Sequence, residues 1–410
     1  MLAPLPICDE ERSAWLRLAT ARGLKPAALR TLLAAFGLPQ NVLAQPFATL
    51  AAAAGSEAAR AAVAAPTPGF ANRLETLNTW CAMPGNALVT LADPAYPPRL
   101  LAMPDPPPLL YVQGRLSLLH ARGIAVVGSR SATPQALEDA ARFARAFAAA
   151  GATVVSGLAL GVDGAAHRGA LDERGGTAAV VGTGADLVYP RAHRTLAAQI
   201  AQRGAILSEW PLGTPARSAN FPQRNRLIAA LVEGVVIVEA AMRSGSLITA
   251  RLANEMGRDV FALPGSIHAP LARGCHRLIK EGAQLVESPE EVLEALGIQP
   301  PAARAAPAAP AVSATRSVGE NIAQPARAAT HELPRQNSHA RLPGNPDPEA
   351  LHVLDALGHA PATLEILAAR TELSEATLQA ALLRLELSGQ LNSLPGGWFV
   401  RAALRQGLFT

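Results

Sequence analysis

The stretch Ile124-Ala-Val-Val-Gly-Ser-Arg130 contains residue types that could bind an anionic oxygen, most simply that of a phosphate. Its four apolar residues predict a buried parallel strand, and the pattern from Pro134 to Ala150 predicts a helix after the turn. Gly128 lets the backbone approach a ligand closely, the helix start offers unpaired N–H groups, and Arg130 adds a positive charge. Because the Lys-Ser/Thr signature is missing, we exclude a nucleotide-kinase phosphate loop.

Later strands of the predicted sheet also end in loops rich in glycine, hydroxyl groups or arginine. These loops begin at Ser156, Gly182, Ser208, Glu239 and Leu263. Doubly wound topology brings the carboxyl ends of parallel strands to one edge of the sheet, so we expect the loops to converge on one site.

Several residues of these loops also have purely structural interpretations. Gly157 is equally compatible with a tight turn, Asp163 with a helix cap, and His167 with a satisfied core or helix-surface histidine. Arg224 and Arg226 could pair with buried carboxylates, for which Glu209 and Glu239 are the candidates.

Phe221 precedes Pro222 on what we expect to be a loop, and an apolar ring on a loop needs a partner. A nucleobase would serve, because a stacked base contributes about 1–3 kcal/mol. The sequence offers no evident nucleophile–base pair, metal-ligand cluster or spaced pair of catalytic carboxylates. The inventory of amides, hydroxyls, arginines and one ring fits holding a phosphate–ribose backbone, so we predict no enzyme, no metal and no cofactor.

The elements that must position these loops form an α/β fold with a Rossmann-like, doubly wound, mainly parallel sheet. The predicted strands are 124–127, 153–156, 178–181, 205–208, 235–238, 260–262 and 284–286. The predicted helices are 134–150, 164–174, 194–203, 225–232, 245–256 and 274–281. Before them, the proline-rich segment 90–114 predicts an extended chain that enters the sheet as an edge strand near Leu109–Val112.

A helical domain is expected over residues 1–85, ahead of a Rossmann-like domain over 86–297. With its glycine turn at Gly23, this helical domain resembles a helix-hairpin-helix or SAM-like unit. A structural role, contact with DNA and contact with protein all remain open for this domain.

Residues 298–346 predict a disordered linker, because proline, alanine and polar residues replace any periodic pattern. Residues 347–405 predict a winged helix, with three helices and a hairpin around Pro395-Gly-Gly397. Seven carboxylates stand against three arginines in 347–402, which suits a polyanion poorly and favours a protein-contact or regulatory role.

The overall composition indicates more about the cellular environment of the protein than about its function. The chain has 410 residues and a formal net charge of +4, which is compatible with nucleic acid but weak evidence for it. Cys8, Cys81 and Cys275 are scattered, which predicts a reducing cytoplasm without disulfides or zinc. We find neither a signal peptide nor an apolar run long enough for a membrane span, so we expect no membrane contact.

Five motifs resemble, in order and spacing, those of the DNA-processing protein DprA (Smf) family. They are Gly128-Ser-Arg130, Ser156-Gly-Leu-Ala-Leu-Gly-Val-Asp163, Phe221-Pro-Gln-Arg-Asn-Arg226 with Ile228, Ser244-Gly-Ser-Leu-Ile-Thr-Ala250 and Leu278-Ile-Lys-Glu-Gly-Ala283. The resemblance covers residues 1–297, and many members also carry a winged helix. It implies a non-catalytic cytoplasmic protein that binds and protects incoming single-stranded DNA during natural transformation. It also implies a homodimer that loads the RecA recombinase onto that DNA.

The same resemblance implies roles for individual residues. The turn at Gly128 would hold a phosphate, and Phe221 would stack on a base. Where family members often carry a lysine three residues before that phenylalanine, this chain has Ser218, next to Arg217. The implied DNA-binding residues are Gly128, Ser129, Arg130, Gly157, Arg217, Phe221, Arg224, Asn225, Arg226, Ser244, Gly245 and Ser246. The implied self-association surface consists of His276, Ile279 and Leu285.

Two other functions remain open from the sequence. A nucleotide phosphoribohydrolase of the lysine decarboxylase-like kind shares a related fold but uses a Pro-Gly-Gly-x-Gly-Thr…Glu motif. This chain offers only Pro264-Gly-Ser266 and Ser244-Gly-Ser246. A small-nucleotide sensor without DNA contact is the third possibility.

Overall fold

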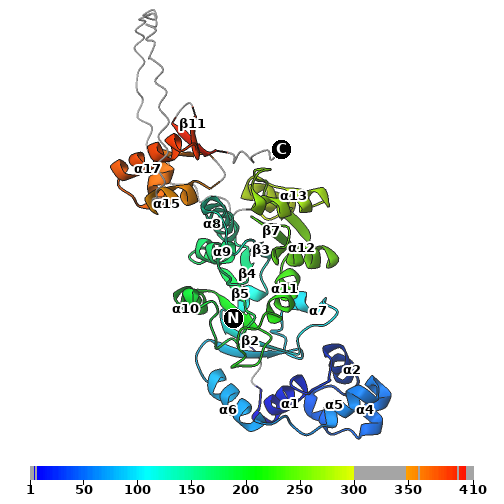
Figure 1. Cartoon of the computed structure of the whole chain (residues 1–410). Helices are drawn as coiled ribbons and strands as arrows, with labels where there is room; N and C mark the ends of the chain where they lie inside the picture. The colour runs from blue at the N-terminus through cyan, green and yellow to red at the C-terminus, as the bar shows by residue number, and fades with distance from the viewer. Residues whose placement is uncertain (1–3, 5–6, 300–347, 359–360, 395–396, 403–410) are drawn as a thin grey trace, which may run out of the picture.

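The computed structural model describes residues 4, 7–299, 348–358, 361–394 and 397–402 (Figure 1). Nearly all of the linker expected at 298–346, and residues 403–405 of the expected winged-helix domain, lie outside the described residues. Figure 1 shows a helical N-terminal part, a central α/β part and a small C-terminal part in succession.

The centre of the molecule is a nine-stranded sheet in the order β1-β2-β6-β5-β4-β3-β7-β8-β9. The seven strands from β6 to β9 in this order run parallel, while β1 and β2 pair antiparallel at one edge. The strands are β1 Asn86–Thr90, β2 Leu109–Gly114, β3 Gly123–Val127, β4 Thr153–Ser156, β5 Thr177–Val180, β6 Ala205–Ser208, β7 Gly234–Ile237, β8 Asp259–Ala262 and β9 Gln284–Leu285. The prediction of a Rossmann-like, mainly parallel sheet is confirmed.

The strand order reverses between β3 and β7, because the chain builds outward from β3 to β6 and then returns to the other side of β3. In open α/β sheets ligands bind at this reversal, outside the carboxyl ends of the strands. The topology therefore places the candidate site between the loops that follow β3 and β7.

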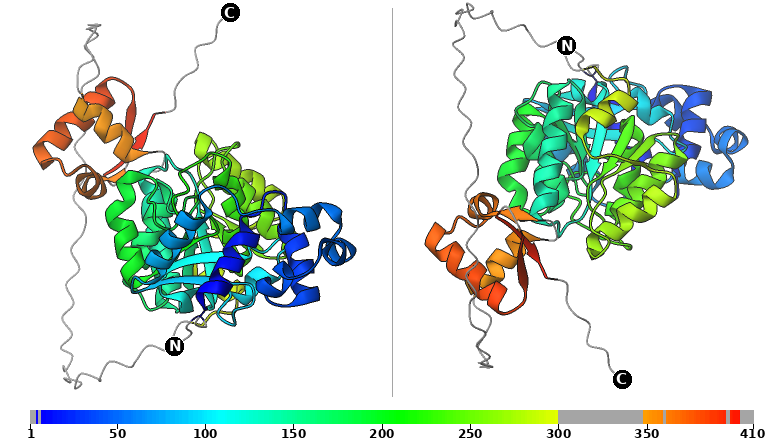
Figure 2. Two further views of the ribbon diagram at one scale, coloured as in Figure 1. Left: turned by 90° about the horizontal axis from the view of Figure 1, so that it is seen from below. Right: turned by 90° about the horizontal axis from the view of Figure 1, so that it is seen from above.

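Helices cover both faces of the sheet (Figures 1 and 2). One face is covered by α8 Pro134–Ala149, α9 Val162–Ala170, α10 Arg194–Arg203 and α14 Pro289–Ala295. The other is covered by α7 Pro98–Leu101, α11 Asn220–Leu231, α12 Ser246–Glu255 and α13 Arg273–Lys280. Successive side chains of a strand point to opposite faces, so Ile124 and Val126 pack beneath α8 while Ala125 and Val127 pack on the α11 side. Short 3₁₀ helices lie at Leu116–Leu119, Arg191–His193 and Pro270–Ala272.

The N-terminal part is entirely helical and packs on the antiparallel edge of the sheet. Its helices are α1 Asp9–Ala19, α2 Pro26–Phe36, α3 Pro39–Leu43, α4 Phe47–Ala54, α5 Ser56–Val63 and α6 Phe70–Cys81. Gly23 adopts φ +86° in the turn between α1 and α2, a conformation that glycine adopts without strain. Trp80 of α6 meets Tyr111 of β2 edge-on, with ring centroids 6.1 Å apart, which joins the helices to the sheet.

The C-terminal part is a winged helix with its own core. Its elements are α15 Pro348–Leu357, β10 Ala362–Thr363, α16 Leu364–Thr371, α17 Glu375–Leu387, β11 Leu391–Leu394 and β12 Trp398–Arg401. The three helices and the hairpin agree with the prediction. β10 was not predicted, because it pairs with β12 through only two residues and is too short to leave an alternating pattern.

Among the described residues, we find no helix with both the length and the apolar character needed to cross a bilayer.

One helix boundary differs from the prediction in a way that matters for the site. We expected a helix from 225, but α11 begins at Asn220 and includes Phe221 and Pro222. Proline is tolerated in the first turn of a helix, because the N–H that it lacks would have no intrahelical partner there. The expectation of a loop at Phe221 is therefore wrong, and its ring is fixed by a helix.

Candidate nucleic-acid interface

A groove of about 750 Å³ lies at the strand-order reversal, open along the carboxyl ends of the parallel strands. Loops and helix starts that follow β3, β4, β5, β6 and β7 line it, so the expected convergence of the loops is observed. Its glycine, polar and aromatic lining includes Gly128, Ser129, Arg130, Tyr189, Ser218, Phe221, Arg224, Asn225, Arg243, Ser244, Gly245 and Ser246.

The turn after β3 is tightly packed and ends in an exposed charge. A side chain at Gly128 would place its Cβ 2.7 Å from Val162 and 2.9 Å from a backbone oxygen, so only glycine fits. Ser129 is buried, and its Oγ accepts the Ser131 N–H at 3.2 Å. Arg130 is exposed and available to a phosphate.

The start of α8 is less open to an anion than the sequence predicts. The N–H and the hydroxyl of Thr133 both donate to the buried carboxylate of Glu239, each at 3.0 Å. Thr133 Oγ1 also accepts the Ala136 N–H, which caps the helix. Because Glu239 already supplies the negative group at this helix start, Arg130 is the better-placed phosphate contact.

Two aromatic rings and a guanidinium cluster on one wall of the groove. The Phe221 and Tyr189 ring centroids lie 5.5 Å apart with a 42° interplanar angle, and the Arg130 guanidinium lies 5.3 Å from the Phe221 centroid. The Tyr189 side chain is 48% exposed and faces solvent. Tyr189 was not among the predicted site residues. The available signal was its position in the loop after β5, which belongs to the same converging set.

Arg224 forms the floor of the groove rather than an open contact. It is 3% exposed, its Nη1 donates to the Val180 carbonyl, and it lies beside the buried Asp163. Asp163 in turn accepts the N–H groups of Gly157 and Ala159 at 3.1 and 3.3 Å. Burial lowers the pKa of Arg224 to about 10 and Asp163 opposes that shift, so the guanidinium stays charged at neutral pH.

Gly157 makes room for Arg224 at the floor of the groove. A Cβ at Gly157 would lie 1.9 Å from Arg224 Nη1, so glycine is needed to seat the guanidinium beneath the β4 loop. Gly157 does not line the groove. Its place in the site is therefore indirect, through the position of Arg224.

The expectation that Arg226 lines the groove is wrong. Positions 224 and 226 point in nearly opposite directions on a helix, since two residues correspond to about 200° of rotation. Arg226 pairs with Glu209 and donates to the Asp105 carbonyl at 3.0 Å, on the side of the N-terminal helices. The alternative prediction, a pair with Glu209, is confirmed for Arg226.

The remaining predicted residues divide between the groove and its surroundings. Asn225 donates to the Gly245 carbonyl at 3.3 Å, and the hydroxyls of Ser244 and Ser246 lie 2.7 Å apart, all within the groove. Arg217 is exposed before α11 but does not contribute to the lining, where Ser218 takes part instead.

His167 is a core residue, which agrees with the structural alternative for it. It is fully buried; its Nδ1 lies 2.7 Å from Thr177 Oγ1 and its Nε2 accepts the Leu158 N–H at 3.2 Å. Burial, reinforced by nearby positive groups, lowers the pKa of His167 to about 3.

This burial predicts a pH-dependent stability. A histidine with pKa about 3 when folded and about 6.5 when unfolded binds more protons in the unfolded chain. The stabilisation that the neutral His167 contributes to folding is fully present above pH 6.5. As the pH falls toward 3, up to about 4–5 kcal/mol of this stabilisation is lost. We expect urea unfolding from pH 7.5 down to 4.5 to show a decrease in stability that is shallower in His167→Gln. Equal slopes in the two proteins would contradict this assignment.

The predicted self-association residues lie at the opposite edge of the sheet from the N-terminal helices. His276 and Ile279 are on α13, and Leu285 is exposed on the edge strand β9. His276 Nε2 lies 3.0 Å from the Gly265 carbonyl oxygen, and Ile279 packs partly against the core.

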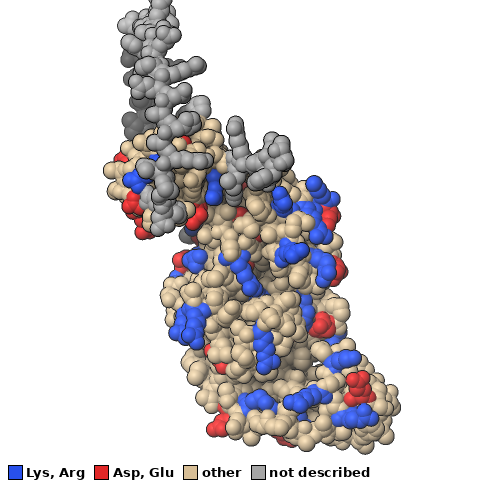
Figure 3. All heavy atoms as spheres, in the orientation of Figure 1, with Lys and Arg blue, Asp and Glu red and all other residues tan. Residues whose placement is uncertain are grey.

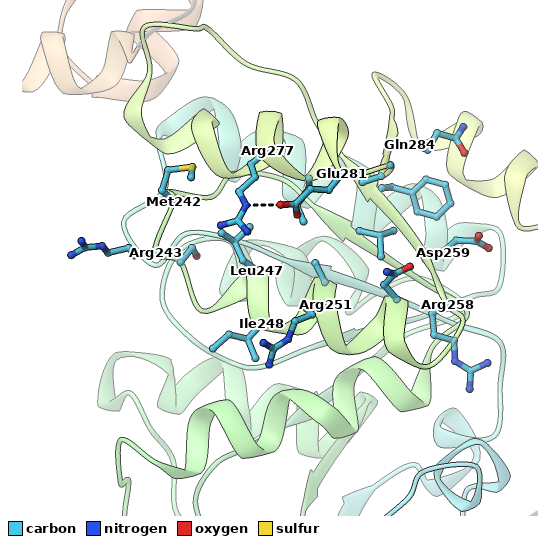
Figure 4. A pocket seen from close by; sticks show the side chains of 18 residues that line it. Met242, Arg243, Leu247, Ile248, Arg251, Arg258, Asp259, Arg277, Glu281 and Gln284 are labelled. Atoms are coloured by element: carbon cyan, nitrogen blue, oxygen red, sulfur yellow. Dashed lines mark hydrogen bonds and ion pairs between the residues drawn. The ribbon is translucent and has the colours of Figure 1, made fainter.

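A second pocket of about 640 Å³ opens beside this edge, between α12 and α13. Figure 4 shows Met242 and Leu247 lining it, together with Arg277, which pairs with Glu281 at 2.7 Å. His276, Ile279 and Leu285 do not line this pocket, although their neighbours Arg277, Leu278 and Gln284 do.

Cationic side chains are prominent on the face of the molecule drawn in Figure 3, where Lys and Arg are more apparent than Asp and Glu. This agrees in sign with the formal net charge of +4.

By fold and site, the chain is a Rossmann-like α/β protein with a polar groove at its topological switch point and an appended winged helix. Residues 87–297 match the model of the family described as DNA recombination-mediator protein A, and residues 337–397 match the DprA winged helix domain. The chain belongs to this DprA (Smf) family of DNA-processing proteins, and the predicted resemblance is confirmed.

Similar proteins are found in distant bacteria. Protein Smf of Escherichia coli is 47% identical over 224 residues, which are 54% of this chain and 60% of that protein. Protein Smf of Synechocystis is 37% identical over 316 residues, 75% of this chain and 78% of that protein. The crystal structure of DNA processing protein A from Streptococcus pneumoniae is 35% identical with a TM-score of 0.57, covering 71% of this chain and 98% of that one.

Proposed function

We propose that the groove between β3 and β7 binds single-stranded DNA. The observation that carries this proposal is the cluster of Arg130, Phe221 and Tyr189, which combines a phosphate contact with stacking surfaces on one wall. Aromatic rings stack most readily on bases that are free of a partner strand, since a duplex must first be unstacked, so the arrangement favours an unpaired polynucleotide over a duplex.

The remaining polar groups suit the DNA backbone. Arg243 is exposed at the rim, and Ser244, Gly245 and Asn225 present hydroxyl, backbone and amide groups to the groove. Contacts of this kind position a strand without reading its bases, so we expect little sequence preference.

We further propose that the protein acts by binding and not by catalysis. The buried Glu239 is bonded to Thr133, His167 is in the core, and Asp163 is bonded to backbone N–H groups beside Arg224. Within the described part of the chain, we find no cluster of three or more His, Cys, Asp and Glu side chains that could hold a metal ion.

Family membership supports the cellular role that we propose. The family is described as a recombination mediator, which fits a cytoplasmic protein that protects incoming DNA in natural transformation and delivers it to RecA. Delivery is testable by following RecA-dependent ATP hydrolysis on single-stranded DNA coated with single-strand-binding protein. Addition of this protein should shorten the lag, and an unchanged lag would argue against delivery.

Arg130 provides the test of the phosphate contact. We expect Arg130→Ala to weaken binding of an unstructured oligonucleotide of about 20 bases, whatever its sequence. We also expect the slope of log K against log salt to become less steep by about 0.7, because one phosphate contact is lost. Fluorescence anisotropy measures both quantities. Arg203→Ala, which removes an arginine of the same domain that pairs with Asp172, is the matched control and should leave the slope unchanged.

The same assay separates the other functions. A small-nucleotide sensor predicts that a nucleoside monophosphate displaces the oligonucleotide, and a phosphoribohydrolase predicts release of free base. Equal affinity of Arg130→Ala and the unmodified protein would contradict the groove as the DNA site.

We propose that the protein self-associates through the surface of His276, Ile279 and Leu285. A homodimer would cover the exposed leucine and the edge strand β9, whose unpaired backbone groups otherwise face solvent. We expect Leu285→Glu to shift the protein toward monomer in sedimentation velocity at micromolar concentration, since it introduces a charge into the interface. Leu101→Glu, at a comparably exposed leucine of α7, is the control, and a shift in both or in neither would argue against this surface.

A further inference from the structure

Helix α17 of the winged helix is apolar on two sides, although only one side is covered. Leu378, Leu382 and Leu385 are buried in the core of the domain. On the outer side, Leu383 is 56% exposed and Leu387 is 80% exposed. The apolar residues of a surface helix normally face the core, so Leu383 and Leu387 have no covering partner within the described chain.

The wing beside α17 carries two more exposed apolar residues. Leu394 of β11 and Trp398 of β12 are cross-strand neighbours, 41% and 40% exposed. The Ser393 hydroxyl donates to Glu386 Oε1 at 2.6 Å, which ties the wing to the last turn of α17. We call the four apolar residues Leu383, Leu387, Leu394 and Trp398 the α17–wing surface.

The charges around this surface disfavour two of its possible occupants, DNA and a second copy of the same surface. α17 is the helix that would enter the DNA major groove in a DNA-reading winged helix. Here its exposed charges are the two carboxylates of Glu375 and Glu386 and the guanidinium of Arg384, a net negative set that a phosphate backbone repels. If two copies paired through this surface, the carboxylates of one copy would face and repel those of the other, so self-pairing is also disfavoured.

The domain is held against the first turns of α8. Arg370 of α16 bonds to Glu138 at 2.7 and 2.9 Å and to Gln135 at 2.8 Å, both on α8, and its side chain is 8% exposed. α15 also contacts α8, and Figure 1 shows α17 on the outer side of the domain.

We propose that the α17–wing surface docks a basic amphipathic helix of a protein partner. Leucine-like anchors of that helix would cover Leu383 and Leu387, and its lysines or arginines would face Glu375 and Glu386. The residues that would carry this contact are distinct from those of the groove, so partner binding and DNA binding are separable.

The probe is a synthetic helical peptide of about 18 residues, with leucine at the spacing of one helix face and lysine elsewhere. A second peptide carries glutamate in place of lysine. Binding of each labelled peptide to the full chain, free of DNA, is measured by anisotropy at about 50 and 200 mM salt. We expect the lysine peptide to bind at least about tenfold more tightly than the glutamate peptide, with affinity that falls as salt rises.

The Leu383→Gln/Leu387→Gln double variant tests the site, because glutamine keeps helix propensity and both side chains are exposed. We expect it to lose at least about tenfold in affinity for the lysine peptide while its oligonucleotide affinity is unchanged. Leu101→Gln is the matched control and should bind the peptide like the unmodified chain. Three results would overturn the proposal: equal binding of both peptides, peptide binding that survives the double variant, or loss of duplex DNA binding or of self-association in that variant.

Discussion

Replacing Arg224 by methionine is expected to lower the free energy of unfolding by about 3–5 kcal/mol, the usual effect of leaving a buried charge uncompensated. The change would leave the fully buried Asp163 without its counter-charge and the Val180 carbonyl without its donor. Urea denaturation monitored by circular dichroism measures the loss. The effect arises from the floor of the groove and not from DNA, so it appears in the free protein.

Two further variants separate this bracing role from a phosphate contact. Arg130→Met removes an exposed guanidinium from the same groove and should change stability by no more than about 0.5 kcal/mol. Asp163→Asn combined with Arg224→Met removes both charges and should recover part of the lost stability. If Arg224→Met were fully stable and instead reduced the salt dependence of DNA binding, Arg224 would be a phosphate ligand and our interpretation would be wrong.

Phe221→Ala is expected to weaken single-stranded DNA binding by about 5- to 150-fold, which corresponds to a stacking contribution of about 1–3 kcal/mol. Tyr189→Ala should produce a loss of the same order, because its ring is exposed beside Phe221. Since the two rings touch, the double variant should lose less than the sum of the single losses. Anisotropy titrations at one salt concentration measure all three affinities.

The salt dependence identifies the kind of contact that is lost. Removing a ring should leave the slope of log K against log salt unchanged, in contrast to Arg130→Ala. Because Phe221 is half-buried, thermal unfolding must first establish that each variant is folded. Phe221→Leu keeps an apolar side chain and should bind better than Phe221→Ala but less well than the unmodified protein. Full affinity in Phe221→Ala and Tyr189→Ala would rule out stacking on this wall.

The sheet and the convergence of its loops follow directly from the sequence. Short apolar runs such as Ile124–Val127 alternate with helical patterns. Such runs are typical of the strands of a parallel sheet that helices cover on both faces. The order of the motifs along the chain then indicates that the glycine-rich loops after these strands meet at one edge. For the same reason the membership in the DprA family is readable from the sequence.

The direction of individual side chains is less predictable, because it depends on neighbours distant in the chain. Pro222 suggested a break, yet it lies in the first turn of α11, where its missing N–H has no consequence. Tyr189 joins the site only because the loop after β5 folds back toward α11 and brings its ring beside Phe221.

The sequence by itself determined the architecture and the chemical character of the groove. Hydrophobic periodicity and glycine-rich turns are properties of short segments, so they can be recognised without knowing which other segments pack against them. Only the tertiary structure decided which arginines reach the groove. Arg130 is exposed, Arg224 is buried against Asp163, and Arg226 turns toward Glu209. A charge is free for a ligand only if no buried carboxylate lies within reach, and that distance is set by packing between segments far apart in the chain.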